Sequence, residues 1–83
     1  MCKSYDYLGS SSDGGCAQYV RVPVWNLVPI PDNVSFEVAA MTEPCAVALH
    51  ALRRAQLEVG DNVVIYGPGT IGMLIAQWAR AWG

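Results

Sequence analysis

The 83-residue sequence has few charged residues: 14% of it is Asp, Glu, Lys or Arg, against roughly 25% in an average soluble domain. Five basic and seven acidic residues give a formal net charge of −2, which provides no basic surface for nucleic acid and no polybasic anchor for a membrane. No apolar run approaches the roughly 18 residues of a transmembrane helix, and residues 1–6 lack the apolar core of a signal peptide. We therefore expect neither a nucleic-acid partner nor a membrane partner.

Cysteine pairs are also missing. The three cysteines, Cys2, Cys16 and Cys45, are odd in number and far apart, and none belongs to a CxxC motif. A disulfide framework is therefore not expected, and a reducing cytoplasm is the predicted location.

Apolar residues, by contrast, are abundant. They make up 53% of the chain, although a chain of this length buries only about 60% of its unfolded surface. Part of the apolar surface should therefore meet another polypeptide, and we expect a homo-oligomer.

The first half of the sequence predicts short strands. The turn signal Asp13-Gly14-Gly15 precedes a strand expected over residues 16–22, which Pro23 ends because proline cannot donate a ladder hydrogen bond. Residues 24–28 form a second short extended piece.

Two helices are then expected. Ser35 should cap a helix that begins at Phe36. Thr42 should cap a second helix, with Pro44 tolerated in its first turn because no hydrogen bond is lost there. This second helix is predicted to run to about Ala55.

The end of the sequence carries its most informative pattern. A β-rich run over residues 63–66 leads into the turn Gly67-Pro68-Gly69-Thr70-Ile71-Gly72 and a helix expected over residues 70–82. This is the strand, glycine-rich turn and helix that open a dinucleotide-binding βαβ unit.

Each glycine has its own task in such a unit. Gly67 allows the tight turn, Gly69 lets the backbone approach a pyrophosphate, and Gly72 lets the helix pack close to the strand. The pyrophosphate itself lies on free N–H groups at the helix N-terminus. Only eleven residues follow Gly72, so we expect this βαβ unit to be incomplete in the chain.

Three other side chains could carry chemistry. Glu43 is either a first-turn helix acid or a zinc-binding or catalytic carboxylate. Considered without any family resemblance, its sequence context favours the first-turn helix acid. His50 is expected to be a packed core histidine rather than a ligand. Cys45 lies in a helical first turn, where a thiolate is stabilised, but no nearby base is evident and an inert buried cysteine is expected.

Four segments together resemble one protein family over nearly the whole chain. They are Cys2-x-x-Tyr5-Asp6-Tyr7-Leu8-Gly9-Ser10 with Asp13-Gly14-Gly15-x-Ala17-x-Tyr19-Val20; Pro31-Asp32-Asn33-Val34-Ser35-Phe36-Glu37; Glu43-Pro44-x-x-Val47-x-x-His50-Ala51; and Gly67-x-Gly69-x-Ile71-Gly72. The sequence is similar to the zinc-dependent medium-chain alcohol dehydrogenases, in particular their polyol branch of sorbitol and galactitol-1-phosphate dehydrogenases.

The resemblance implies an α/β fragment of such an enzyme. Residues 1–42 would be the end of a GroES-like β domain, residues 43–60 an interdomain helix and turn, and residues 61–83 the first β-strand and helix of a Rossmann NAD(P)-binding domain. The implied cofactors are zinc and NAD or NADP, and the implied substrate is a small alcohol or polyol.

Site residues also follow from the resemblance. Glu43 matches a glutamate at the catalytic zinc, and Cys2 matches the last of four cysteines around a structural zinc. Gly67, Gly69, Thr70, Ile71 and Gly72 match the cofactor-binding turn. The other zinc ligands and the ribose-binding acid of the family have no counterpart here, and Ser11-Ser12 stands where relatives often have basic residues.

The resemblance implies that the chain derives from a dehydrogenase. We expect the 83-residue chain alone to be inactive and to hold neither zinc nor NAD(P) stably. Two other hypotheses remain open. The chain could be a small self-associating α/β module without catalytic activity, or a mononucleotide-binding protein.

Overall fold

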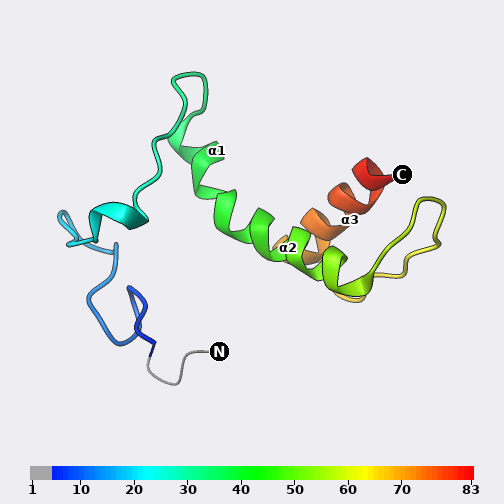
Figure 1. Ribbon diagram of the computed structural model, residues 1–83, viewed down its shortest axis with the longest axis horizontal. Helices are drawn as coiled ribbons and strands as arrows, with labels where there is room; N and C mark the ends of the chain where they lie inside the picture. Colours follow the sequence, from blue (N-terminus) through cyan, green and yellow to red (C-terminus); the bar gives the residue numbers. More distant parts are fainter. Residues whose placement is uncertain (1–4) are drawn as a thin grey trace.

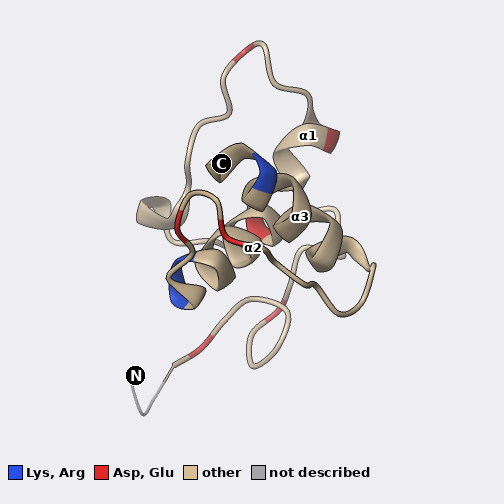
Figure 2. Cartoon of the chain, turned by 90° about the vertical axis from the view of Figure 1, so that its right-hand side faces the viewer, with Lys and Arg blue, Asp and Glu red and all other residues tan. Residues whose placement is uncertain are grey.

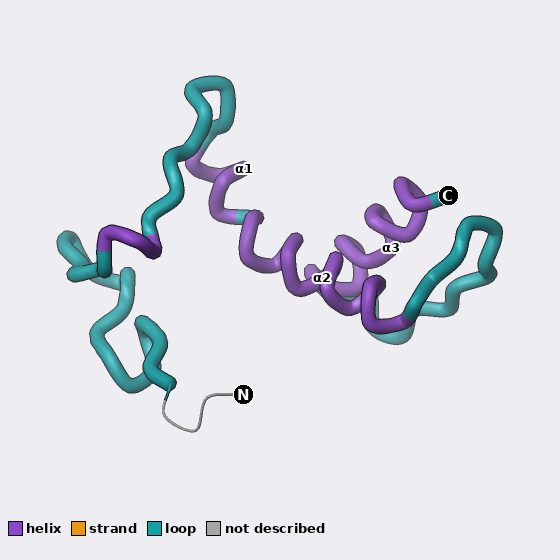
Figure 3. The backbone as a smooth tube through the Cα atoms, in the orientation of Figure 1, coloured by secondary structure: helices purple, strands orange, loops and turns teal. Residues whose placement is uncertain are grey.

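The computed structural model describes residues 5–83, and the regular structure of this part of the chain is entirely helical. A 3-10 turn, η1 (Val24–Asn26), is followed by the short helix α1 (Phe36–Ala40) and two longer helices, α2 (Thr42–Ala55) and α3 (Thr70–Trp82) (Figure 1). All other described residues are loops and turns, apart from one isolated bridge between Leu8 and Ser12 (Figure 3). Among these helices none has both the length and the apolar character needed to cross a bilayer.

The strands expected over residues 16–22 and 63–66 are absent from the described part of the chain, so these predictions were wrong. A strand exists only if its backbone pairs with a neighbour, and no residue in 16–22 or 62–68 makes a backbone–backbone hydrogen bond with another residue of the described range 5–83. The extended piece expected at 24–28 is also wrong in part. Residues Val24–Asn26 form η1, which the N–H of Leu27 closes by donating to the carbonyl of Val24.

The start of α1 agrees with the sequence prediction. Ser35 is the N-cap residue, and its hydroxyl accepts a hydrogen bond from the N–H of Val38 at 3.4 Å. The backbone N–H of Glu37 and the Ser35 hydroxyl hold the pKa of the Glu37 carboxyl below its ordinary value. The first turn of α1 is thus satisfied locally, as an N-cap serine allows.

The start of α2 differs from the prediction. Thr42 is the first helical residue and not the cap, because Met41 before it already has helical dihedral angles (φ −78°, ψ −7°). The carbonyl of Met41 accepts the N–H of Cys45 at 2.9 Å, so α2 follows α1 with only one residue between them. Pro44 lies in the first turn of α2, as expected.

The C-terminus of α2 is defined by a left-handed residue. Gln56 has φ 54° and donates its N–H to the carbonyl of Arg53. Arg53 and Arg54 occupy the last turn, where the helix dipole favours positive charge. The expected end at about Ala55 is confirmed.

The core lies where α3 packs against α2 (Figure 1). Ala48 and Leu52 of α2 are 0% and 4% exposed, and they are the only buried hydrophobic residues of the described chain. Leu74, Ile75 and Trp78 of α3 are half-buried. The apolar stripe of α3 therefore packs on another helix.

Most other apolar side chains are exposed. The chain has a radius of gyration of 16.1 Å, against about 12 Å for a compact domain of this length. Its accessible surface is 7788 Å², against about 4,900 Å² for a compact protein of its mass. Charged residues are few and scattered along the backbone (Figure 2). The surface in excess of a compact fold, about 2,900 Å² by the same scaling, is therefore largely uncharged.

The α2–α3 contact should account for most of the stability of the chain. We expect Leu52→Ala to destabilise the helical pair by roughly 2 kcal/mol, because it removes one of two buried side chains. Leu27→Ala is the matched control, since Leu27 is 59% exposed. Thermal unfolding followed by circular dichroism at 222 nm would test this, and equal effects of the two substitutions would contradict it.

Candidate functional site

The candidate site is the glycine turn that leads into α3. Gly67 has φ +96°, in the left-handed region that favours glycine. Gly69 is the N-cap residue of α3, with ordinary extended dihedral angles (φ −78°, ψ −175°) and no side chain to cap the helix. The tight turn expected at Gly67 is therefore present, although it follows a loop rather than a strand.

Gly72 lies where α3 comes closest to the segment before it. A Cβ at this position would overlap the carbonyl oxygen of Gly67 and would lie 3.5 Å from Cγ2 of Ile65. The backbone contact between Gly72 and Gly67 thus leaves no room for a side chain. Gly69 differs, because a Cβ there would meet no atom within 4 Å, so the fold itself does not require glycine at this position.

The N-terminus of α3 can accept an anion. The first hydrogen bond of this helix runs from the N–H of Met73 to the carbonyl of Gly69 at 2.9 Å, so the N–H groups of Thr70, Ile71 and Gly72 have no acceptor within the helix. The first turn contains no acidic residue that would repel an anion. These donors and the open space at Gly69 fit the pyrophosphate of a dinucleotide, but whether the five turn residues bind one stays a prediction.

The residues predicted to bind zinc do not come together. Glu43 is exposed, at the second position of α2. Cys2 lies outside the described residues. Within residues 5–83, no group of three or more His, Cys, Asp and Glu side chains could hold a metal ion. A catalytic zinc requires about three protein ligands, so the described residues do not make a zinc site on their own.

The single histidine and the helical cysteine lie in different surroundings. His50 is exposed on α2, so the expectation of a packed core histidine was wrong, because α3 covers only the face of α2 that carries Ala48 and Leu52. Cys45 is half-buried. It lines an apolar groove of about 380 Å³ together with Leu49 and with Trp78 of α3.

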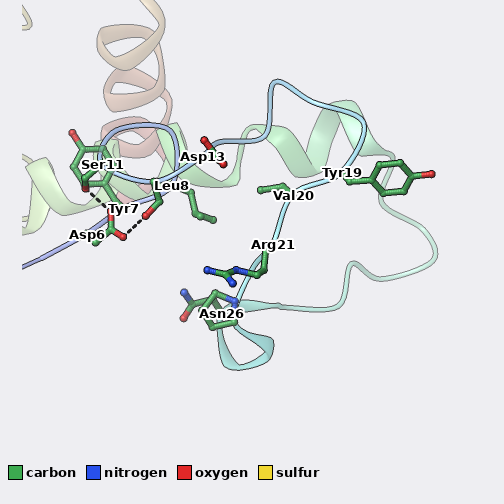
Figure 4. Close-up of a pocket in the computed structure, with 11 residues that line it drawn as sticks. Asp6, Tyr7, Leu8, Ser11, Asp13, Tyr19, Val20, Arg21 and Asn26 are labelled. Carbon is green, nitrogen blue, oxygen red and sulfur yellow. Dashed lines mark hydrogen bonds between the residues drawn. The ribbon is translucent and has the colours of Figure 1, made fainter.

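The sequence interpretation missed a polar cavity near the N-terminus. This cavity measures about 840 Å³ and is lined by residues from the turn at 6–13 and from residues 19–26. The hydroxyls of Ser11 and Ser12 both donate to the carboxylate of Asp6 (Figure 4). Hydrogen bonds from these hydroxyls hold the pKa of the exposed Asp6 carboxyl below its ordinary value, and the hydrogen bond from Ser11 has the largest effect. The run of serines after a turn-rich segment was the only sequence signal for it.

Comparison with curated proteins shows what the chain is similar to. It is 44% identical over all 83 residues to galactitol 1-phosphate 5-dehydrogenase of Escherichia coli K12 and 41% identical over 83 residues to sorbitol dehydrogenase of Halalkalibacterium halodurans. It is also 40% identical over 78 residues, 93% of the chain, to (R,R)-butanediol dehydrogenase of Bacillus subtilis. The predicted resemblance to zinc-type alcohol and polyol dehydrogenases is therefore confirmed along the chain.

The similarity is confined to a part of each relative. The chain spans 24% of the length of the E. coli and H. halodurans enzymes and 22% of the B. subtilis enzyme. No family model matches the chain, and no solved structure matches it.

The hydrogen bonds around Asp6 predict a pH response. Because the pKa of Asp6 is lowered in the fold, its stabilising contribution is present above the ordinary carboxyl pKa and is lost as the pH falls below about 4. Ser11→Ala should raise the pKa of Asp6, whereas Ser10→Ala should not, since Ser10 donates no hydrogen bond to this carboxylate. An NMR titration of the Asp6 carboxyl carbon checks this, and equal pKa values in the two variants would disprove the assignment.

The glycine turn predicts a contrast between two alanine substitutions. Gly72→Ala should destabilise the chain by roughly 1–3 kcal/mol, because the new methyl group overlaps backbone that cannot move freely. Gly69→Ala should be close to neutral, since its φ is ordinary and its surroundings are open. Helix content and unfolding midpoint measure both effects, and a tolerated Gly72→Ala would mean that α3 does not approach Gly67 as described.

Proposed function

We propose that this chain is part of a zinc-dependent oxidoreductase that transfers hydride between a small alcohol or polyol and NAD or NADP. The observation that carries the proposal is the turn from Gly67 to Gly72, which combines a left-handed glycine, an open approach at Gly69 and free N–H groups at the start of α3. The names of the similar dehydrogenases support the same class of reaction.

The proposal divides the chain into three parts. Residues 1–42 belong to the GroES-like catalytic domain, residues 43–60 connect the domains, and residues 61–83 open the Rossmann domain. In this arrangement residues 63–66 become a strand once neighbouring strands pair with them, which the free backbone of this segment permits. The protein acts in the cytoplasm.

The cofactor turn has a definite task in this proposal. The N–H groups of Thr70, Ile71 and Gly72 donate to the pyrophosphate, which the helix dipole of α3 also attracts. Gly69 allows the phosphate to approach the backbone closely. When bound, the nicotinamide supplies the hydride acceptor or donor.

The zinc ligands can be assigned only in part. Glu43 is proposed as the residue of this chain at the catalytic zinc, and Cys2 as one ligand of a structural zinc. Because the described residues contain no complete metal site, any catalytic zinc requires ligands beyond residues 5–83, and the exposed position of Glu43 leaves its carboxylate free to join them.

A second candidate is a self-associating module without catalytic activity. The observation that favours it is the large uncovered apolar surface of the chain, whose accessible area of 7788 Å² far exceeds that of a compact fold. A homo-oligomer is part of both candidates, so the cofactor turn is the feature that separates them.

A hybrid enzyme tests the dehydrogenase proposal. The chain replaces the matching quarter of E. coli galactitol 1-phosphate 5-dehydrogenase, and the hybrid should retain measurable oxidation of galactitol 1-phosphate. Gly69→Val in the hybrid should abolish NAD binding while zinc content stays unchanged, because the branched side chain blocks the approach of the pyrophosphate.

Gly15→Val is the matched control, since Gly15 also has open surroundings and no positive φ. NADH binding is measured by energy transfer from tryptophan, and zinc by elemental analysis. A Gly69→Val hybrid that keeps its zinc and binds NAD with unchanged affinity would refute the placement of the cofactor turn.

A further inference from the structure

One wall of the polar cavity near the N-terminus is a turn that local contacts hold in place. Two backbone hydrogen bonds close this turn, from the N–H of Gly9 to the carbonyl of Ser12 at 2.9 Å and from the N–H of Ser10 to the carbonyl of Tyr7 at 3.2 Å. Gly9 has φ +86°, and a Cβ at Gly14 would lie only 2.7 Å from the Cα atom of Gly9. All these contacts lie within residues 7–14, so the shape of this wall is set locally.

The polar side chains of this wall accept hydrogen bonds. The hydroxyls of Ser11 and Ser12 both donate to the carboxylate of Asp6 (Figure 4). Because a serine hydroxyl has a single proton, these two hydroxyls can only accept a hydrogen bond from a ligand. The carboxylates of Asp6 and Asp13 also line the cavity, and an ionised carboxylate is an acceptor as well. A ligand that contacts these four side chains must therefore donate hydrogen bonds to them.

The second segment of the cavity supplies hydrogen-bond donors. Arg21 and Asn26 line the cavity from residues 19–26 (Figure 4). The N–H of Asn26 donates to the carbonyl of Pro23 at 2.9 Å, which fixes this residue at the end of η1. A guanidinium has five N–H donors, and an amide has both donors and an acceptor. The cavity thus combines a wall of acceptors with a segment that can donate.

We propose that this cavity binds the hydroxyl groups of the substrate and selects an uncharged polyol over its phosphate ester. A hydroxyl group both donates and accepts, so a polyol can donate to Asp6 and Asp13. The same polyol can accept from Arg21 and Asn26. A phosphate monoester carries a charge of about −1.5 to −2 at neutral pH, and the two carboxylates repel it. Among the cavity-lining residues that the structure describes, Arg21 is the single cation.

The size and accessibility of the cavity suit such a ligand. Its volume of about 840 Å³ lies within the range of small-molecule sites. All of its lining residues are exposed except Ser12, which is half-buried, so their polar groups can be reached from solvent. The inference rests on the proposed function, because it assigns the cavity to the substrate of that reaction.

The hybrid enzyme tests this selection as a ratio of two substrates. The kcat/KM for galactitol divided by that for galactitol 1-phosphate should be about tenfold higher in the hybrid than in the unmodified E. coli enzyme, because the carboxylates repel the ester at close range. Asp6→Asn in the hybrid should lower this ratio, since it removes a repelling charge and keeps the shape of the side chain. Asp32→Asn is the matched control, since Asp32 is also exposed and lies outside the cavity.

A smaller graft separates this inference from the proposed function. Only residues 6–13 are transferred into the E. coli enzyme, which keeps its own cofactor turn, and the ratio should again shift toward galactitol. A hybrid that is inactive with both compounds would count against the proposed function, and the graft then decides on the cavity by itself. An unchanged ratio in the graft, a shift toward the phosphate ester, or equal effects of Asp6→Asn and Asp32→Asn would overturn the inference.

Discussion

The packing of α3 on α2 is the interaction on which the rest of this structure depends. It buries Ala48 and Leu52 and fixes the direction of the α3 axis relative to α2. Without this contact neither helix would hold its form, because isolated helices of 13 and 14 residues are marginal in water. The burial of Leu52 contributes about 2 kcal/mol, a large share for a core of two residues. In the described part of the chain, η1 packs against none of the helices.

The glycine turn is a consequence of that packing. With α3 fixed on α2, the chain must reverse sharply at Gly67 and pass close to Gly72, where only a residue without a side chain fits. The same geometry leaves the first N–H groups of α3 free and the space at Gly69 open. A feature that the fold requires therefore also creates the donors that a pyrophosphate would use. In the proposed enzyme, the strand before the turn and the zinc around Glu43 would be completed by polypeptide other than residues 5–83.

The sequence predicted what depends on local interactions. The N-cap at Ser35, the end of α2 near Ala55 and the helix over residues 70–82 follow from residues within one turn of each other. The strands at 16–22 and 63–66 were wrong because strand formation requires a partner, and none is present among the described residues. Thr42 failed as a cap because Met41 had already become helical. The hydrogen bonds of Asp6 with Ser11 and Ser12 depend on the conformation of the turn between them. The hydrophobic periodicity of a sequence does not predict the conformation of such a turn.

Among residues 5–83 the buried hydrophobic side chains are confined to the α2–α3 pair, and we expect residues 16–22 and 62–66 to become ordered only when they pair with other polypeptide. Amide hydrogen exchange of the dilute chain, followed residue by residue, tests this most directly, because exchange reports local opening free energies. The account predicts protected amides within Thr42–Ala55 and Thr70–Trp82 and fast exchange across residues 16–22 and 62–66. Strong protection of those two segments in the monomeric chain would contradict it.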